Sequence, residues 1–350
     1  MRAARLYDNQ DLRVENIDTP EVGAKDIKVR VAWTGICGSD LHEYNDGPLS
    51  IPKDGKQPLT GHSLPVTMGH EFSGVVEEVG SEVTKVAVGD RVAVNPLIVS
   101  GKNPDKLIDM YQGFTFVGLG ADGGFADHVV VDESYAIKLT DNVDLEVAAL
   151  VEPLSVSMQA VRESEIEFGD SVAIFGAGPI GLAQILAVKA AGARDVFVFD
   201  LSDERLEKAK EVGADYAINS GETDPVEFVR NLYPYGVDRS FEVAGVPQTL
   251  NQAIQLTRPR GMVTITSIFT HPIEFRVYSL TSTGVRLASS LGYEDDIFAL
   301  TVKMIETGQI DPSPLITDRI ELEDIVDKGF KELQNNKRQA KILVKLSGEH

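Results

Sequence analysis

Apolar and polar residues alternate at every second position in several short runs of the first 150 residues. Residues 27–31 show this pattern most cleanly, and residues 74–80 and 90–94 form similar runs between turns. A period of two is typical of strands that bury one face. The pattern predicts an irregular, mostly antiparallel β domain in this half of the chain.

The pattern changes near residue 150, where strand-like runs begin to alternate with helical periodicity. The expected strands are residues 171–175, 195–199, 216–218, 239–243 and 262–266. The expected helices include residues 179–191 and 203–212, then 295–307 and 322–335, before a closing strand at 341–346. Repeated strand–helix units favour a parallel, doubly wound sheet.

A glycine-rich turn follows the first strand of this second half. Its sequence fits G-x-G-x-x-G, and the strand before it and the helix after it are the context that a dinucleotide-binding turn needs. Gly176 permits the tight turn, Gly178 lets the backbone approach a pyrophosphate, and Gly181 lets helix and strand pack closely. Pro179 and Ile180 begin the helix, whose N-terminus offers unpaired N–H groups to the phosphates.

Asp200 ends the second expected strand, 19 residues after Gly181. An acid at this point hydrogen-bonds the adenosine ribose and repels a 2′-phosphate, so we predict NAD as the cofactor in preference to NADP. Arg205 is expected over the adenine or near the ribose, and no basic cluster follows it to clamp a 2′-phosphate. The alternative is a turn that binds no ligand, because one fold hosts many functions.

Length, composition and charge narrow the classes of partner. A chain of 350 residues suggests about two domains. The 33 basic and 54 acidic residues give a net charge of −21, which argues against nucleic acid or an anionic membrane as a partner. The first residues lack an apolar signal region, and glycines and a proline interrupt the longest apolar run, 172–188. We therefore expect a cytoplasmic protein without a membrane span.

Side chains that bind metals or move protons are scattered through the first half, at Cys37, His42, His62, His70, Glu71 and Glu152. Cys37 is the single cysteine, which excludes an internal disulfide and a zinc site built on several thiolates. Glycine, proline or apolar neighbours predict partly buried turn positions for Cys37, His70 and Glu152. No short zinc motif links them, so a buried structural cysteine and histidine remain the alternative on the residues alone.

Residues 35–42, 69–76, 89–92, 123–126 and 152–154, together with the glycine-rich turn, form an ordered set of motifs. The set resembles the zinc-dependent medium-chain dehydrogenase/reductase superfamily over nearly the whole chain. Glu152-Pro153-Leu154 resembles its polyol branch, and the insert at 46–67 resembles (R,R)-2,3-butanediol dehydrogenases. The resemblance implies an α/β protein with a GroES-like β-rich catalytic domain, residues 1–151 with 292–350. It also implies a doubly wound Rossmann coenzyme domain, residues 152–291.

The resemblance further implies one catalytic zinc held by Cys37, His70 and Glu152. Glu71 is expected beside it, either as an occasional ligand or in the shell around the ligands. Many relatives hold a structural zinc on four cysteines in a lobe that corresponds to residues 95–115, where this chain has no cysteine. We expect this zinc to be absent and the lobe to be packed by Leu97, Ile98, Leu107, Ile108, Met110, Tyr111 and Phe114.

The implied reaction is a hydride transfer between NAD(H) and a secondary alcohol or ketone, with zinc as the Lewis acid. The expected pair is 2,3-butanediol and acetoin, so the substrate is a vicinal diol or hydroxyketone. In related alcohol dehydrogenases a hydroxyl and an imidazole relay the released proton, and the resemblance carries this role to Ser39 and His42. The alternative is that Ser39 caps a helix starting near Asp40 and that His42 lies on its surface.

The residues are also compatible with three other functions. One is another dehydrogenase of the same branch, acting on a polyol such as sorbitol or an amino alcohol such as threonine. The second is a zinc-free quinone or enone reductase of the same fold, and the third is a catalytically silent NAD-binding structural protein.

Relatives form homodimers or homotetramers, often through the last Rossmann strand, here near residues 285–291.

Overall fold

The computed structural model describes residues 1–100, 113–269 and 271–349. By their internal contacts these residues form two compact units, each with its own hydrophobic core. The first unit takes the described residues of Met1–Glu152, Glu294–Gly308 and Ile316–His350, and the second takes Pro153–Tyr293 and Gln309–Leu315. The chain passes from the first unit to the second inside helix α3 (Val151–Glu163).

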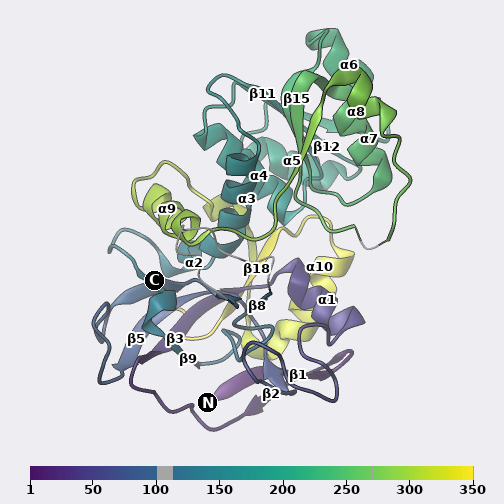
Figure 1. Ribbon diagram of the computed structural model, residues 1–350. Coiled ribbons are helices and arrows are strands. Elements are labelled where there is room, and N and C mark those ends of the chain that lie inside the picture. The colour runs from purple at the N-terminus through teal and green to yellow at the C-terminus, as the bar shows by residue number, and fades with distance from the viewer. Residues whose placement is uncertain (101–112, 270, 350) are drawn as a thin grey trace. The chain divides into compact units, whose positions relative to one another are not determined.

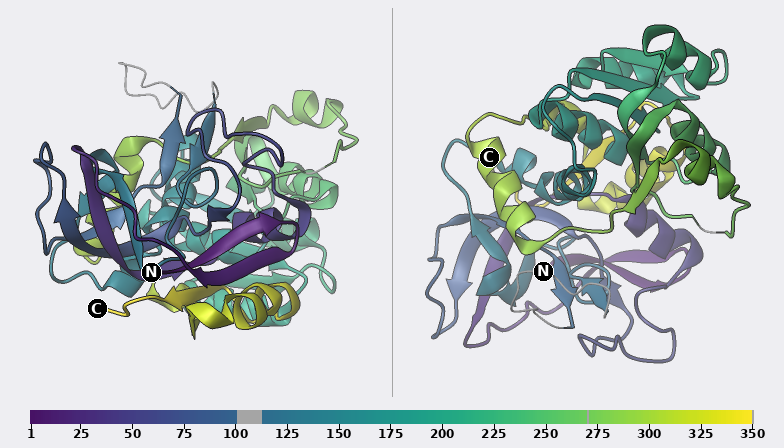
Figure 2. Two further views of the ribbon diagram at one scale, coloured as in Figure 1. Left: turned by 90° about the horizontal axis from the view of Figure 1, so that it is seen from below. Right: turned by 45° about the horizontal axis from the view of Figure 1, so that its top comes forward.

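The first unit is built on largely antiparallel strands, as the period-two runs predicted. Its main sheet has the order β10-β6-β5-β3-β18-β17, and β9 also pairs with β3. The bounds are β3 (Asp26–Gly35), β5 (Glu71–Val79), β6 (Arg91–Val94), β9 (His128–Asp132), β10 (Ala136–Lys138), β17 (Ile316–Glu321) and β18 (Lys341–Lys345). Figure 2 shows the yellow C-terminal segment beside the purple N-terminal strands, because β18 pairs with β3.

Two smaller sheets complete the strands described in this unit. They are β2 (Asp11–Asn16), β1 (Arg2–Asp8) and β4 (Val66–Thr67) in one sheet, and β7 (Leu97–Val99) with β8 (Phe114–Phe116) in the other. The second pair lies in the region of residues 95–115, which was expected to be packed without a structural zinc. Leu97 is buried there, and Phe114 meets Phe116 edge-on with ring centroids 5.7 Å apart. The other packing candidates Leu107, Ile108, Met110 and Tyr111 lie outside the described residues.

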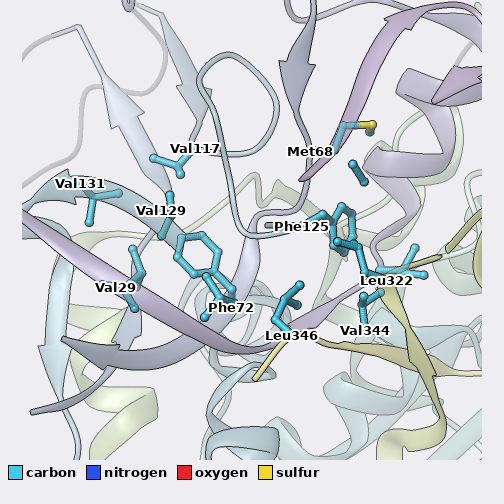
Figure 3. Packing of buried hydrophobic residues seen from close by; sticks show 14 of the residues in the cluster. Val29, Met68, Phe72, Val117, Phe125, Val129, Val131, Leu322, Val344 and Leu346 are labelled. Atoms are coloured by element: carbon cyan, nitrogen blue, oxygen red, sulfur yellow. The ribbon is translucent and has the colours of Figure 1, made fainter. Parts of the chain in front are cut away.

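Buried side chains from several strands form the core of the first unit. Val29 from β3, Phe72 from β5 and Val129 from β9 belong to one cluster (Figure 3). A side chain on Gly124 would lie 2.6 Å from the Phe72 ring, so glycine is required for this close approach. The packing fixes the start of β5, where two of the candidate site residues lie.

Helices of the first unit include several that the sequence pattern did not predict. The bounds are α1 (Gly38–Asp46), η2 (Glu133–Tyr135), α2 (Leu145–Ala148), α9 (Asp295–Glu306), η4 (Leu322–Asp324), η5 (Ile325–Phe330) and α10 (Lys331–Asn335). Helix α9 confirms the expected helix at 295–307. The expected single helix at 322–335 is instead a 3₁₀ turn, a π-helical segment and an α-helical turn. Gly329 lies in the π segment, where its missing side chain lets Ile36 approach.

The second unit is a six-stranded parallel sheet with helices between its strands, which confirms the doubly wound prediction (Figure 1). The strand order is β13-β12-β11-β14-β15-β16. The strand bounds are β11 (Ser171–Phe175), β12 (Asp195–Asp200), β13 (Tyr216–Asn219), β14 (Val237–Glu242), β15 (Thr257–Ile265) and β16 (Arg286–Ser289). The helix bounds are α4 (Pro179–Ala190), α5 (Asp203–Val212), α6 (Pro225–Leu232), α7 (Pro247–Leu256), α8 (Tyr278–Thr283) and η3 (Ser313–Leu315).

Strands β11 and β12, in the interior of this sheet, are almost wholly buried, which is why they appear as apolar runs in the sequence. All five residues of β11 are fully buried. Helices α4 and α5 pack against β11 and β12. Within the described part of the chain, no helix is both long enough and apolar enough to cross a membrane.

Candidate active site

Cys37 lies between β3 and helix α1 in the first unit. It is the N-cap residue of α1, and its backbone N–H donates to Oδ2 of Asp40 at 2.9 Å. An acid three residues after the N-cap satisfies an N–H that the helix itself leaves unpaired. Asp40 is fully buried, so this contact fixes the turn that carries the thiol.

His70 and Glu71 are placed by the turn that leads into β5. Gly69 has a φ of +95°, and a side chain there would lie 2.8 Å from the Phe125 ring, so both conformation and packing require glycine. Glu71 is the first residue of β5, and His70 packs near Phe116 with ring centroids 5.8 Å apart. Both site residues are buried.

The structure brings Cys37, His70 and Glu71 together. Each offers one ligand atom, and these atoms all lie within 4.8 Å of one another. Nδ1 of His70 lies 3.3 Å from Oδ1 of Asp40. Burial alone lowers the pKa of His70, but the charges of Asp40 and Cys37 outweigh burial and hold this pKa well above its ordinary value. The cluster therefore favours bound positive charge.

Lys341 of β18 is also buried in this cluster, and its Nζ donates to Oε1 of Glu71. Burial lowers the pKa of Lys341, but the charges of Glu71, Cys37 and Glu152 outweigh it, so the pKa is raised overall. Glu71 Oε2 is buried without a hydrogen-bond partner among the described residues. A side chain on Gly35 would lie 2.3 Å from that oxygen, so Gly35 leaves the space that Glu71 occupies.

Glu152 lies in the first turn of α3, which corrects the expectation that it sits at a turn between elements. Pro153 follows it, and a proline is tolerated there because the first turn of a helix leaves its N–H groups unpaired. Glu152 is buried, and its charge acts on Lys341. It is not part of the group of three ligands that the described residues form within 4.8 Å.

The residues at this site fit a zinc ion. A thiolate, an imidazole and a carboxylate are ligands that zinc prefers. The unpartnered Oε2 of Glu71 is a buried carboxylate oxygen, which is costly unless a cation or donor reaches it. Asp40 beside His70 is the carboxylate partner that a metal-binding histidine usually has.

Ser39 and His42 lie on helix α1. Ser39 is inside the helix and Cys37 is its N-cap, so the alternative that Ser39 caps this helix is wrong. The Ser39 Oγ lies 3.9 Å from Cys37 Sγ. His42 has 59% of its side chain exposed, with Nδ1 3.4 Å from Oδ2 of Asp46.

Each glycine of the glycine-rich turn in the second unit has its own local geometry. Gly176 has a φ of +106°. A side chain on Gly181 would lie 1.9 Å from the Gly176 carbonyl oxygen, so only glycine lets α4 start this close to β11. A side chain on Gly178 would have no neighbour within 4 Å, so the backbone there is open. Gly178 is the N-cap of α4, and Pro179 and Ile180 are its first residues.

Asp200 ends β12 and holds two turns in place. Its Oδ2 accepts from the Ala177 N–H at 2.8 Å, and its Oδ1 accepts from the Ser202 N–H at 2.9 Å. Nη1 of Arg205 lies 3.8 Å from Oδ2 of Asp200. The expected acid and arginine are therefore neighbours, at the carboxyl end of the strand beside the glycine-rich turn.

Two residues of the metal cluster were missed by the sequence analysis, Asp40 and Lys341. The spacing of Asp40, three residues after Cys37, is that of a capping box and could have been a signal. Lys341 is the first residue of the apolar strand β18, and a lysine buried at such a position needs a charged partner. Its partner Glu71 is 270 residues away in the sequence, so no local pattern could identify the pair.

Family models match both parts of the chain. The "alcohol dehydrogenase GroES-like domain" matches residues 23–141, and "zinc-binding dehydrogenase" matches residues 179–307. The chain belongs to the zinc-binding dehydrogenase family. The family confirms the fold predicted from the sequence, a GroES-like β-rich part and a Rossmann-type parallel sheet.

Relatives over the full length support the family and its branch. A Bacillus subtilis protein named (R,R)-butanediol dehydrogenase is 44% identical over 352 residues, which cover 99% of each chain. The crystal structure of 2R,3R-butanediol dehydrogenase from Bacillus subtilis has a TM-score of 0.93 at 42% identity, covering 98% of this chain and 99% of the other. An Escherichia coli alcohol dehydrogenase complexed with NADH has a TM-score of 0.88 at 28% identity, covering 99% of each chain.

Proposed function

We propose that this chain transfers a hydride between NAD(H) and a secondary alcohol or its ketone, with 2,3-butanediol and acetoin as the preferred pair. The observation that carries the proposal is the group of Cys37, His70 and Glu71, of which the last two are buried, in a chain 44% identical to a protein named (R,R)-butanediol dehydrogenase. The substrate class is a vicinal diol or hydroxyketone. Relatives named sorbitol dehydrogenase are more distant, at 30–31% identity, which favours the butanediol assignment within the branch.

Cys37, His70 and Glu152 are the proposed ligands of a single zinc. Lys341 holds Oε1 of Glu71 and leaves only Oε2 without a partner, so Glu71 is proposed to stay beside the ion. Glu152, which contributes to the same cluster of charge around Lys341, is left to complete the three ligands of a catalytic zinc. Because this chain has a single cysteine, we also propose that no four-cysteine structural zinc is present.

Zinc and NAD(H), when bound, supply a Lewis acid that lowers the pKa of the substrate hydroxyl and a carrier for the hydride. The protein's own task is to hold the ligands and to move the proton. Asp40, with Oδ1 3.3 Å from Nδ1 of His70, is proposed to orient the ring when the metal is bound and to leave the other ring nitrogen for the metal. Burial of His70 and Glu71 keeps water away from these two side chains, which strengthens the charge interactions that they make.

Ser39 and His42 are the proposed proton relay. The Ser39 hydroxyl is next to Cys37 Sγ, and His42 is three residues further along the same helix. Residues at this spacing are neighbours on one helix face. His42 is exposed to solvent, so its imidazole can pass a proton to water.

Asp200 is the proposed determinant for NAD over NADP. Its carboxylate is fixed by two backbone N–H groups beside the glycine-rich turn, where the adenosine ribose binds in this fold. Each oxygen of this carboxylate can accept a further hydrogen bond, which suits the ribose hydroxyls. The negative charge of the carboxylate repels a 2′-phosphate. Arg205 is proposed to lie near the same ribose, with its charge compensated by Asp200.

The protein is proposed to form a homodimer or homotetramer through β16. This strand is at the edge of the sheet in the described residues, and Leu287 and Leu291 beside it are exposed. An edge strand with unpaired backbone groups can pair with a second copy.

We propose the cytoplasm as the location of the protein, since the thiol of Cys37 must stay reduced to serve as a ligand.

A substrate panel tests the proposed function. The purified enzyme is given NAD with (R,R)-, (S,S)- and meso-2,3-butanediol, sorbitol and L-threonine, and NADH formation is followed with and without a zinc chelator. We expect fastest turnover of a 2,3-butanediol, and loss of that turnover with the chelator. Faster turnover of sorbitol or threonine would show that the enzyme is a sorbitol-type or threonine-type dehydrogenase and not a butanediol dehydrogenase. Turnover that is unaffected by removal of zinc would overturn the metal mechanism.

A further inference from the structure

Glu242 is a buried acid of the second unit that the function described above does not use. It is the last residue of β14 and has no exposed surface. Its Oε1 accepts from the N–H groups of Ala244 and Gly245 at 3.0 and 2.9 Å and from the Thr249 hydroxyl at 2.7 Å. Its Oε2 accepts from the Ser267 hydroxyl. Four donors use the accepting capacity of one carboxylate in full, so this buried acid is held firmly in one position.

The position of Glu242 in the sheet places it at the point where the strand order reverses. β14 lies next to β11, with Glu242 opposite Phe175, and the sheet continues in the other direction through β12. Ligands of doubly wound sheets bind outside the carboxyl ends of the strands at this point. Because the adenosine ribose is proposed to bind beside Asp200 at the end of β12, the nicotinamide half of the dinucleotide is expected beside the end of β14.

The loop that follows Glu242 packs directly against the glycine-rich turn. The Val243 N–H donates to the Phe175 carbonyl at 2.9 Å. A side chain on Gly176 would lie 3.3 Å from the backbone nitrogen of Ala244. On its other side, the loop meets the end of β15, where a side chain on Gly245 would lie 2.9 Å from the Ile268 carbonyl oxygen. A shift of this loop therefore alters the space beside the turn.

The hydrogen bonds to Glu242 also set which backbone groups the loop presents. In a planar trans peptide the C=O and the following N–H point in opposite directions. Because the N–H groups of Ala244 and Gly245 point toward the buried carboxylate, the carbonyls of Val243 and Ala244 point away from it. Ala244 is exposed, so these acceptors face the outside of the loop.

We propose that Glu242 is a positioning residue for the nicotinamide half of the dinucleotide. It fixes residues 243–245 with their carbonyls outward, as acceptors for the amide or hydroxyl donors of that half. Ser267 and Thr249 hold the carboxylate in turn, so the ends of β14 and β15 and the start of α7 act together. This inference rests on the proposed use of NAD(H) and adds a residue that acts on its binding.

The test compares two ligands that share the adenosine half. Binding of NADH and of ADP is measured by calorimetry for the wild type, Glu242→Asp and Glu242→Gln. Shortening the side chain in Glu242→Asp moves the acceptor away from the loop, so we expect the NADH dissociation constant to rise about tenfold, as for loss of one hydrogen bond to the ligand. The dissociation constant for ADP should change by less than twofold. Glu242→Gln keeps an oxygen for the loop N–H groups and should restore much of the NADH affinity.

Asp238→Asn is the matched control. Asp238 lies near the other end of β14, where it accepts from Ser171 and Arg258, so its loss weakens the sheet without touching the loop. Asp238→Asn should change the dissociation constants for NADH and for ADP by the same factor. Equal weakening of both ligands by Glu242→Asp, or NADH binding unchanged by that variant, would overturn the inference. A wild type that binds ADP but not NADH would overturn the proposed function instead.

Discussion

Nδ1 of His70 lies 3.3 Å from Oδ1 of Asp40, and both side chains are buried. The same carboxylate accepts from the Cys37 N–H through its other oxygen. One acid therefore lies beside the imidazole of one proposed zinc ligand and accepts a hydrogen bond from the backbone of another. This double role explains why Asp40 is buried although it lies in a short, mostly polar helix.

Asp40→Asn should lower zinc affinity by about 10–100-fold, the usual effect of losing the carboxylate partner of a metal-binding histidine. The measurement is competition for zinc against a chelator of known affinity. Asp46→Asn is the control, because Asp46 ends the same helix but is exposed. Equal zinc affinity in the two variants would show that Asp40 does not orient the site.

Lys341→Met should destabilise the zinc-free protein by about 3–5 kcal/mol, because it leaves the buried carboxylate of Glu71 without its partner. Lys341→Arg keeps the positive charge and should lower the stability of the zinc-free protein less than Lys341→Met does. Lys345→Met, on the same strand and 44% exposed, should change stability by no more than about 0.5 kcal/mol. Urea unfolding of the three variants measures these differences, and similar losses for Met at both positions would contradict the role of the buried pair.

Gly178→Ala and Gly181→Ala should separate cofactor binding from folding. A side chain at Gly178 meets nothing within 4 Å, so stability should change by less than about 1 kcal/mol while NADH binding weakens. A side chain at Gly181 would lie 1.9 Å from a backbone oxygen. Gly181→Ala should therefore lower the free energy of unfolding by at least about 1–3 kcal/mol, and it should also weaken NADH binding. Thermal unfolding and NADH titration decide the matter, and full NADH affinity in Gly178→Ala would exclude close approach of a pyrophosphate.

His42→Ala should slow turnover and change its pH profile while zinc stays bound. The reason is that removal of the imidazole interrupts the proposed proton path without touching the ligands. Steady-state kinetics across pH, with zinc content measured on the same samples, gives the answer. Kinetics identical to the wild type at every pH would remove His42 from the mechanism.

Local sequence patterns predicted the second unit well. The strand at 171–175, the helix at 203–212 and the turn with Gly176 and Gly181 are present as expected, because their periodicity and glycine spacing are local properties. The first unit was predicted less fully. The expected helix at 322–335 is divided into three helical types, a difference that arises where Gly329 packs against a distant residue, Ile36.

The candidate metal site was predicted only in part for the same physical reason. Cys37, His70 and Glu71 were singled out by residue type and by resemblance, and the structure brings these three together. The contacts of Asp40 with His70 and of Lys341 with Glu71 join residues that are far apart in the sequence. Such pairs depend on the tertiary fold, so no periodicity or spacing could reveal them.

The zinc content of the purified protein tests the central claim most directly. Elemental analysis should find one zinc per chain in the wild type, held by Cys37, His70 and Glu152. The same analysis should find that zinc lost in Glu152→Gln and largely retained in Glu71→Gln. A wild type without zinc, or with two ions per chain, would contradict the account, as would a Glu152→Gln protein that keeps its full zinc content.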